Sequence, residues 1–134
     1  MKKIKECCFI LTACLMLIST FFLGTLNAQT TEELEKKYAP ILGVYNFDLN
    51  DLGLGNVGIR FFAEDNFLWA ITDVSSEPGK MVPVEEKEFE FIIEDDEEGT
   101  YEIKFIKDNQ GNYTKCQVKN TDMGMDVTGL KEKE

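Results

Sequence analysis

From about residue 42 onward, apolar and polar side chains alternate with a period of two, as in β-strands that bury one face. Turn-forming residues separate the alternating segments about every ten residues, a spacing typical of antiparallel barrels and sandwiches. The expected strands are 42–49, 56–63, 67–74, 81–84, 88–94, 100–107, 113–120 and 124–130. We therefore predict an all-β fold, an antiparallel meander of seven or eight strands that forms a small barrel or half-barrel.

The same alternation predicts which residues face each other in the hairpins. If residues 64–66 form a three-residue loop, Phe61 lies opposite Trp69 on one apolar face. The other expected pairs are Ile59 with Ile71, Phe91 with Ile103, Ile93 with Tyr101, Phe105 with Cys116, Ile103 with Val118, Glu102 with Lys119, and Val118 with Val127. In this register Phe62 and Leu68 share the opposite face.

A short helix is expected before the first strand. Thr30 and Glu33 have the spacing of a capping box, and Pro40 ends the helix, so it covers residues 31–38. Ile92 and Ile106 lie out of phase with the main apolar rows. We expect this second apolar surface either to be covered by the helix or to contact a partner protein or a second copy of the chain. For a partner protein, the acidic rim favours a basic one.

Residues 1–28 have the layout of a secretory signal peptide. Three lysines precede a long apolar segment, and Ala28 supplies the small residue at the cleavage position. Cleavage before Gln29 predicts a secreted or periplasmic bacterial protein with one β-domain, residues 29–134. Removal of Lys2, Lys3, Lys5 and Glu6 changes the net charge from −11 to −13.

Two alternatives exist for this segment. The sequence before Cys14 resembles a lipobox, which would make the protein a membrane-anchored lipoprotein, but the apolar segment continues well past Cys14. The span from Cys7 to Leu26 is long enough for an uncleaved anchor. The polar residues after Ala28 favour cleavage, and we expect no membrane span in the mature chain.

Charge and composition exclude several classes of function. A net charge of −11 repels phosphate backbones, so we expect no nucleic-acid binding. The chain has no histidine, so it has no Ser-His-Asp triad, Cys-His pair or histidine metal site. We expect no cofactor, no metal and no catalytic residue, and we regard the acidic run 94–98 as a solvated hairpin tip rather than a cation site.

Aromatic residues and one arginine are the candidates for ligand binding. Aromatic side chains could line a hollow barrel, although packing of a filled core explains them more simply. Arg60, the only arginine, could hold a ligand carboxylate or pair with a carboxylate of the protein. The candidate ligand-binding residues are Arg60, Phe61, Trp69, Phe91 and Tyr101. Cys116 is expected to be an inert buried thiol.

Several segments resemble a known family. They are Leu42-Gly43-Val44-Tyr45 at a strand start, Trp69 on an early hairpin, Phe89 after a short proline-containing strand, and the hairpin sequence 105–111. Over about residues 38–130 the chain resembles the small β-domain of unknown function that follows serine beta-lactamase-like hydrolases in bacteria. The resemblance implies a lipocalin-like antiparallel barrel or half-barrel and supplies no catalytic residue.

These observations together predict an exported, non-enzymatic β-barrel module that binds a small apolar ligand or a protein partner. One alternative is an accessory domain for a separately encoded hydrolase. The other is a small carboxylate-dependent enzyme, which requires two acids in one desolvated cleft. Asp73 is the candidate for one of these acids, because the expected register places it on the apolar face.

Overall fold

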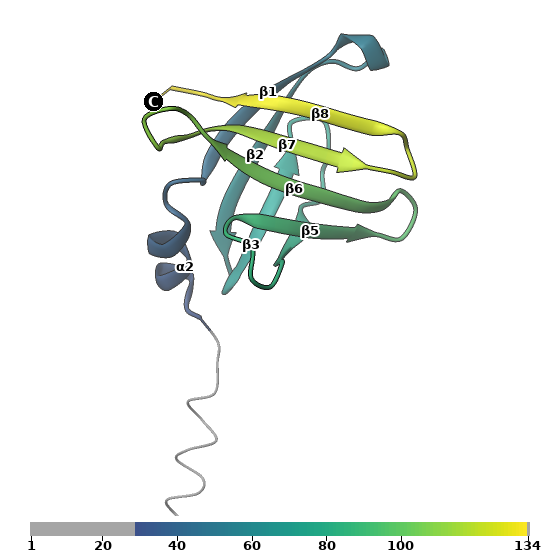
Figure 1. The fold of residues 1–134 in the computed structure, drawn as a ribbon. Helices are drawn as coiled ribbons and strands as arrows, with labels where there is room; N and C mark the ends of the chain where they lie inside the picture. Colours follow the sequence, from purple (N-terminus) through teal and green to yellow (C-terminus); the bar gives the residue numbers. More distant parts are fainter. Residues whose placement is uncertain (1–28, 134) are drawn as a thin grey trace, which may run out of the picture.

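The computed structural model describes residues 29–133, which fold into a closed barrel of eight antiparallel strands in sequence order (Figure 1). The predicted signal peptide, residues 1–28, lies outside the described residues. The elements are α2 (Thr31–Tyr38), β1 (Gly43–Leu49), the 3₁₀ turn η1 (Asn50–Leu52), β2 (Gly55–Glu64), β3 (Phe67–Thr72), β4 (Gly79–Pro83), β5 (Glu90–Asp95), β6 (Gly99–Lys107), β7 (Tyr113–Asn120) and β8 (Met125–Lys131). The predicted all-β meander with a preceding helix is confirmed, and the barrel is closed.

The wall of the barrel varies in strength around its circumference. β6 and β7 are joined along nearly their whole length, whereas β4 and β5 pair only through Val82 with Ile92 and Pro83 with Phe91. Pro83 has no N–H to give to a ladder. Closure of the barrel depends on a second short pairing, between β1 and β8. The β4–β5 ladder is therefore short, although the Val84 N–H also donates to the Glu90 carbonyl at 2.9 Å. It lies near α2, because Tyr38 of the helix packs against Phe91 at 5.5 Å.

The predicted register of β2 and β3 is wrong by one residue. Phe61 pairs with Ala70, and Phe62 pairs with Trp69. The connection has two residues rather than three, because Asp65 and Asn66 both adopt left-handed backbone angles, with φ of 50° and 64°. Such two-residue turns match the twist of the flanking strands. Trp69 consequently faces outward.

The available interior volume explains why the tryptophan lies outside. On the inner side of the wall, Phe61 of β2 pairs with Ala70 of β3, and Ala70 pairs with Gly79 of β4. A Cβ atom added at Gly79 would lie 2.8 Å from Ile93, so this row has no room for larger side chains. The shift also moves Leu68 inside, where it is 3% exposed, and separates it from Phe62.

The remaining predicted registers tested by the ladders of β5–β8 are confirmed. Phe91 pairs with Ile103 and Ile93 with Tyr101. Phe105 pairs with Cys116, Ile103 with Val118, and Glu102 with Lys119, and Val118 pairs with Val127. Gly111 supplies the positive φ, 84°, in the β6–β7 turn. The alternation of residues therefore determines this half of the barrel correctly.

Aromatic rings fill the interior. Phe105 lies at the centre, with ring centroids 4.9 Å from Phe61, 5.4 Å from Tyr45 and 5.9 Å from Phe91 in edge-to-face arrangements. The Tyr45 hydroxyl donates to the Ile41 carbonyl at 3.1 Å, which satisfies its buried polar atom. The packed-core explanation of the aromatic residues thus holds for these inward-facing rings.

The helix closes one end of the barrel. Its capping box is formed, with the Glu33 N–H donating to the Thr30 hydroxyl and the Thr30 N–H donating to the Glu33 carboxylate. The Thr31 N–H donates to the Asn66 side-chain oxygen at 2.9 Å, which ties the helix to the β2–β3 turn. Leu34 and Tyr38 are buried.

One hypothesis from the sequence was that the helix covers Ile92 and Ile106. This hypothesis is wrong. Tyr38 instead packs against Phe89 and Phe91, at centroid distances of 5.7 and 5.5 Å, because the helix caps the interior rather than the outer face. Ile92 and Ile106 lie apart on the outer face, since the Glu90–Lys104 pair falls between them. Within residues 29–133 no helix is long and apolar enough to cross a membrane.

Candidate functional site

The five predicted ligand-binding residues do not form one site. Phe61 and Phe91 both contact Phe105 inside the barrel, and each is 1% exposed. Their packing leaves them as core residues. Phe91 also borders the hollow over β5, β6 and β7 that is described below.

Arg60 and Trp69 lie together on the outer surface. Arg60 is exposed, and its guanidinium carbon lies 4.8 Å from the centroid of the Phe62 ring. Trp69 pairs with Phe62 across the ladder and packs edge-on against Phe67 at 6.2 Å. The Trp69 indole N–H donates to the Glu64 carbonyl at 3.0 Å. Among residues 29–133, none of the ion pairs includes Arg60, so its observed neighbour is an aromatic ring.

Tyr101 lies near the end of the barrel opposite α2. Its hydroxyl contacts the Glu98 carboxylate and lies 3.4 Å from the Met123 sulfur. Partial burial, together with the Glu98 carboxylate, raises the pKa of Tyr101 to about 12. Asn120, which is fully buried, donates to the Glu98 carbonyl and accepts from the Met123 N–H. Tyr101 therefore belongs to a polar network that closes this end.

An apolar hollow lies at the α2 end, between the helix and the ends of β3 and β4. Its volume is about 550 Å³, which is within the usual size range of small-molecule sites. The side chains that line it are Gln29, Leu34, Tyr38, Asp65, Asn66, Phe67, Leu68, Met81 and Pro83. We call this hollow the helix groove. Most of its lining is apolar, and its polar atoms gather where the chain enters the helix and at the β2–β3 turn.

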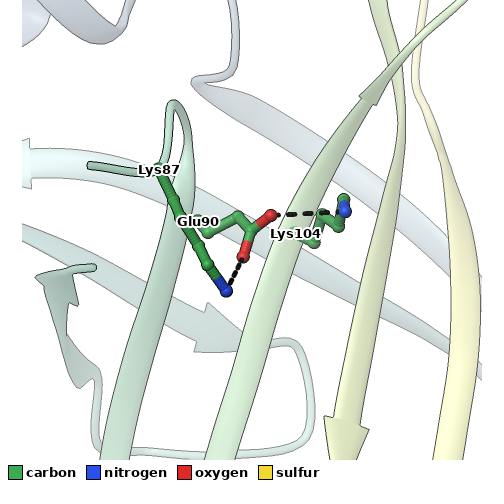
Figure 2. A network of polar contacts seen from close by, with 3 residues as sticks. All are labelled: Lys87, Glu90 and Lys104. Carbon is green, nitrogen blue, oxygen red and sulfur yellow. Dashed lines mark ion pairs between the residues drawn. The ribbon is translucent and has the colours of Figure 1, made fainter. Parts of the chain in front are cut away.

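A second hollow, of about 300 Å³, lies over β5, β6 and β7 and is lined by charged side chains. Figure 2 shows Glu90 between two lysines: its carboxylate lies 3.3 Å from the Lys87 ammonium and 3.2 Å from the Lys104 ammonium. Burial opposes ionisation of Glu90, but the hydrogen bonds from Lys104 and Lys87 outweigh it, so the pKa is lowered from its ordinary value of 4.5. The network places one carboxylate between two ammonium groups, so its net charge is +1.

The acidic hairpin tip 94–98 has the structure of a solvated turn. The Asp95 carboxylate accepts the N–H groups of Glu97 and Glu98, both at 2.8 Å. These two backbone hydrogen bonds lower the pKa of Asp95. In the described part of the chain, no three potential ligands come together in a way that could hold a metal ion.

Neither Cys116 nor Asp73 has a catalytic environment. Cys116 is fully buried, as predicted, and burial raises the pKa of its thiol far above the ordinary range. The prediction that Asp73 shares the apolar face is wrong. Because of the one-residue shift, Asp73 lies exposed on the outer side, where it accepts the Gly58 N–H at 3.1 Å. The structure thus gives the carboxylate-enzyme hypothesis no pair of acids at Asp73.

The sequence-based selection of candidates missed the helix groove. Leu34 and Tyr38 were recognisable only as helix residues, and Met81 and Pro83 only as parts of a short strand. Their proximity depends on the contact between α2 and the ends of β2 and β3, which are distant in the sequence. The one local signal was the polar pair Asp65 and Asn66 at a hairpin turn beside an amphipathic helix.

Comparisons of the chain with protein-family models, with curated proteins and with solved structures find no significant match. The resemblance to the lipocalin-like β-domain therefore stays a prediction, and the function has to be argued from the geometry.

Proposed function

We propose that this protein is an exported β-barrel binding module that holds a small apolar ligand in the helix groove. The observation that carries the proposal is the groove itself, a hollow of about 550 Å³ with a mainly apolar lining at the α2 end of a closed barrel. Apolar hollows of this size with a few polar atoms at one end are typical of small-molecule sites.

Two further features support this location over the barrel interior. The interior rings of Tyr45, Phe61 and Phe105 are packed edge-to-face against one another. The groove, by contrast, adjoins β4, which pairs with β5 through only two residue pairs. A weak seam allows small adjustments of the wall when a ligand enters, at lower cost than in the fully paired β6–β7 region.

The groove is tested by adding bulk to it. Pro83 is exposed and lines the groove, so Pro83→Phe should fill the groove without disturbing the core. Binding of the neutral dye Nile red, followed by fluorescence and displaced by long-chain alcohols, should weaken by about tenfold or more, equivalent to about 1.4 kcal/mol. The matched control is Leu130→Phe on β8, a residue that is 59% exposed and does not line the groove.

Equal dye binding by Pro83→Phe and Leu130→Phe would contradict binding in the groove. Near-ultraviolet circular dichroism of both variants should match the parent and so exclude a change of fold. Loss of dye binding in the Leu130→Phe variant would indicate a different apolar surface.

Export is tested separately at the N-terminus. Cleavage before Gln29 is supported by the basic N-terminal region, by the apolar segment that follows it, and by the small residue Ala28 at the cleavage position. N-terminal sequencing of the protein from its native host should begin at Gln29. A lipidated Cys14, or an intact N-terminus in the membrane fraction, would contradict this part of the proposal.

A further inference from the structure

The outer surface of β2, β3 and β4 is unusually aromatic for a solvated barrel wall. We call it the aromatic face and define it by the outward side chains Arg60, Phe62, Phe67, Trp69, Ile71, Lys80 and Val82. Phe67 is 44% and Val82 is 53% exposed. Large exposed apolar side chains gathered on one surface mark interaction sites more often than scattered ones do.

Two cations lie on this face, and each is held over a ring. The Arg60 guanidinium lies 4.8 Å from the centroid of Phe62, and the Lys80 ammonium lies 3.5 Å from the centroid of Phe67. The ion pairs in the described part of the chain use Lys87, Lys104 and Lys119, so they include neither Arg60 nor Lys80. Two carboxylates border this face: Glu64 at its α2 end and, at the opposite end, Asp73, which accepts the Gly58 N–H on the outer side of β2.

The charge of this face is opposite to that of the molecule. The chain carries a net charge of −11, yet its only arginine and one of its lysines lie here over aromatic rings. A guanidinium over a ring still presents its N–H edge for a bidentate bond to a carboxylate. The rings limit the motion of both cations, so little conformational entropy would be lost when a carboxylate binds.

The register places an apolar platform between the two cations. Phe62, Trp69 and Lys80 occupy one row across three neighbouring strands, and Arg60 precedes Phe62 by two residues on the same face. Arg60 and Lys80 are separated by two strand spacings and by two residues along the strands, so their Cα atoms lie on the order of 12 Å apart. In an extended segment, two carboxylates four residues apart point to the same face and span about 13 Å, with the side chain midway between them on that face as well.

We propose that the aromatic face docks an acidic segment of another protein, in which two carboxylates bind Arg60 and Lys80 and an apolar side chain between them lies on Trp69. Because the barrel is closed, it offers no free strand edge there, and binding has to use these side chains. The basic partner expected from the overall charge would be repelled at this face by Arg60 and Lys80. The proposal does not depend on export, and of the residues that define the aromatic face only Phe67 also lines the helix groove.

Trp69 is the only tryptophan of the chain, so its fluorescence reports directly on this face. The probe is a short peptide in which two glutamates four residues apart flank a leucine at the middle position, and its counterpart has lysine in place of each glutamate. We expect the glutamate peptide to shift Trp69 emission and to bind at least tenfold more tightly than the lysine peptide. Binding should weaken as salt is added.

A charge-matched pair of variants separates local recognition from net charge. Arg60→Ala with Lys80→Ala removes two positive charges from the aromatic face, and Lys104→Ala with Lys119→Ala removes two from the surface of β6 and β7. The first variant should bind the glutamate peptide about tenfold more weakly, as expected for loss of charge-assisted hydrogen bonds. The second should change binding less than twofold.

Three results would overturn the proposal: equal weakening in both double variants, tighter binding of the lysine peptide, or no shift of Trp69 emission with either peptide. Sedimentation of the protein alone provides a further check. Concentration-dependent dimers that disappear in the Arg60→Ala, Lys80→Ala variant would identify a second copy, rather than an acidic partner, as the occupant of the face.

Discussion

The two sides of the barrel wall enclose the same interior but have very different outer surfaces. On β2–β4, Arg60 and Lys80 lie over aromatic rings. On β5–β8, Lys104 and Lys119 lie near carboxylates, 3.2 Å from Glu90 and 3.7 Å from Asp126. We call this second surface the charged face. Ring contacts also occur in the second half, where Lys107 lies 5.0 Å from the Tyr113 ring, but ion pairs with carboxylates are found only there among the described residues.

The comparison shows how a small acidic barrel can have a local surface of opposite character. Period-two alternation requires only that one side of each strand be apolar. The outward positions are then free to serve solubility, as on the charged face, or binding, as we propose for the aromatic face. Neighbouring residues of one strand can therefore have unrelated roles.

The largest effect on the free energy of unfolding is expected from alanine substitutions in one such neighbouring pair, Phe61 and Phe62 on β2. Phe61 is 1% exposed and contacts Tyr45 and Phe105, so Phe61→Ala should lower the free energy of unfolding by about 3–5 kcal/mol. Phe62 faces outward, so Phe62→Ala should lower the free energy of unfolding by only about 1 kcal/mol. Urea unfolding followed by circular dichroism measures both values.

The pair also tests the register of β2 and β3. Each variant is the control for the other, because both remove the same atoms from adjacent residues of one strand. A larger loss for Phe62→Ala than for Phe61→Ala would mean that Phe62 faces the core, and the aromatic face would then not exist as described.

A smaller, pH-dependent effect is expected on the charged face at Glu90. Because hydrogen bonds from Lys104 and Lys87 lower the pKa of Glu90, the charged carboxylate stabilises the fold above its ordinary pKa of 4.5. This stabilisation is lost as the pH falls below 4.5 and through the lowered pKa. Glu90→Gln should cost less than about 1 kcal/mol near neutral pH, as other partly exposed ion pairs do.

The measurement is the melting temperature of Glu90→Gln and the parent between neutral pH and strong acid. The difference between the two proteins should shrink as the pH falls below 4.5. Glu94→Gln, an exposed residue on the same strand, is the control and should show no such convergence. A constant difference at all pH values would mean that the effect of Glu90 does not depend on its charge.

The sequence by itself determined the strands, the helix and its cap, and the registers of β5–β8. In that half, apolar residues occupy one face and the turns contain Gly111 or long polar runs, so only one register buries the apolar rows. Cys116 and Phe105 were for this reason correctly placed opposite each other in the core. No interaction from a distant part of the chain was needed for that result.

Only the tertiary structure decided the register of β2–β3, because apolar side chains occupy both faces there. Phe61 and Phe62 are adjacent, as are Leu68 and Trp69, so alternation supports either register. The filled interior and the two-residue turn at Asp65 and Asn66 make the choice. The helix groove is likewise a tertiary product, since α2 and β4 come together only when the barrel closes. Where only one face of a strand is apolar, the local pattern determines which face is buried. Where both faces are apolar, the interior volume and long-range contacts determine it.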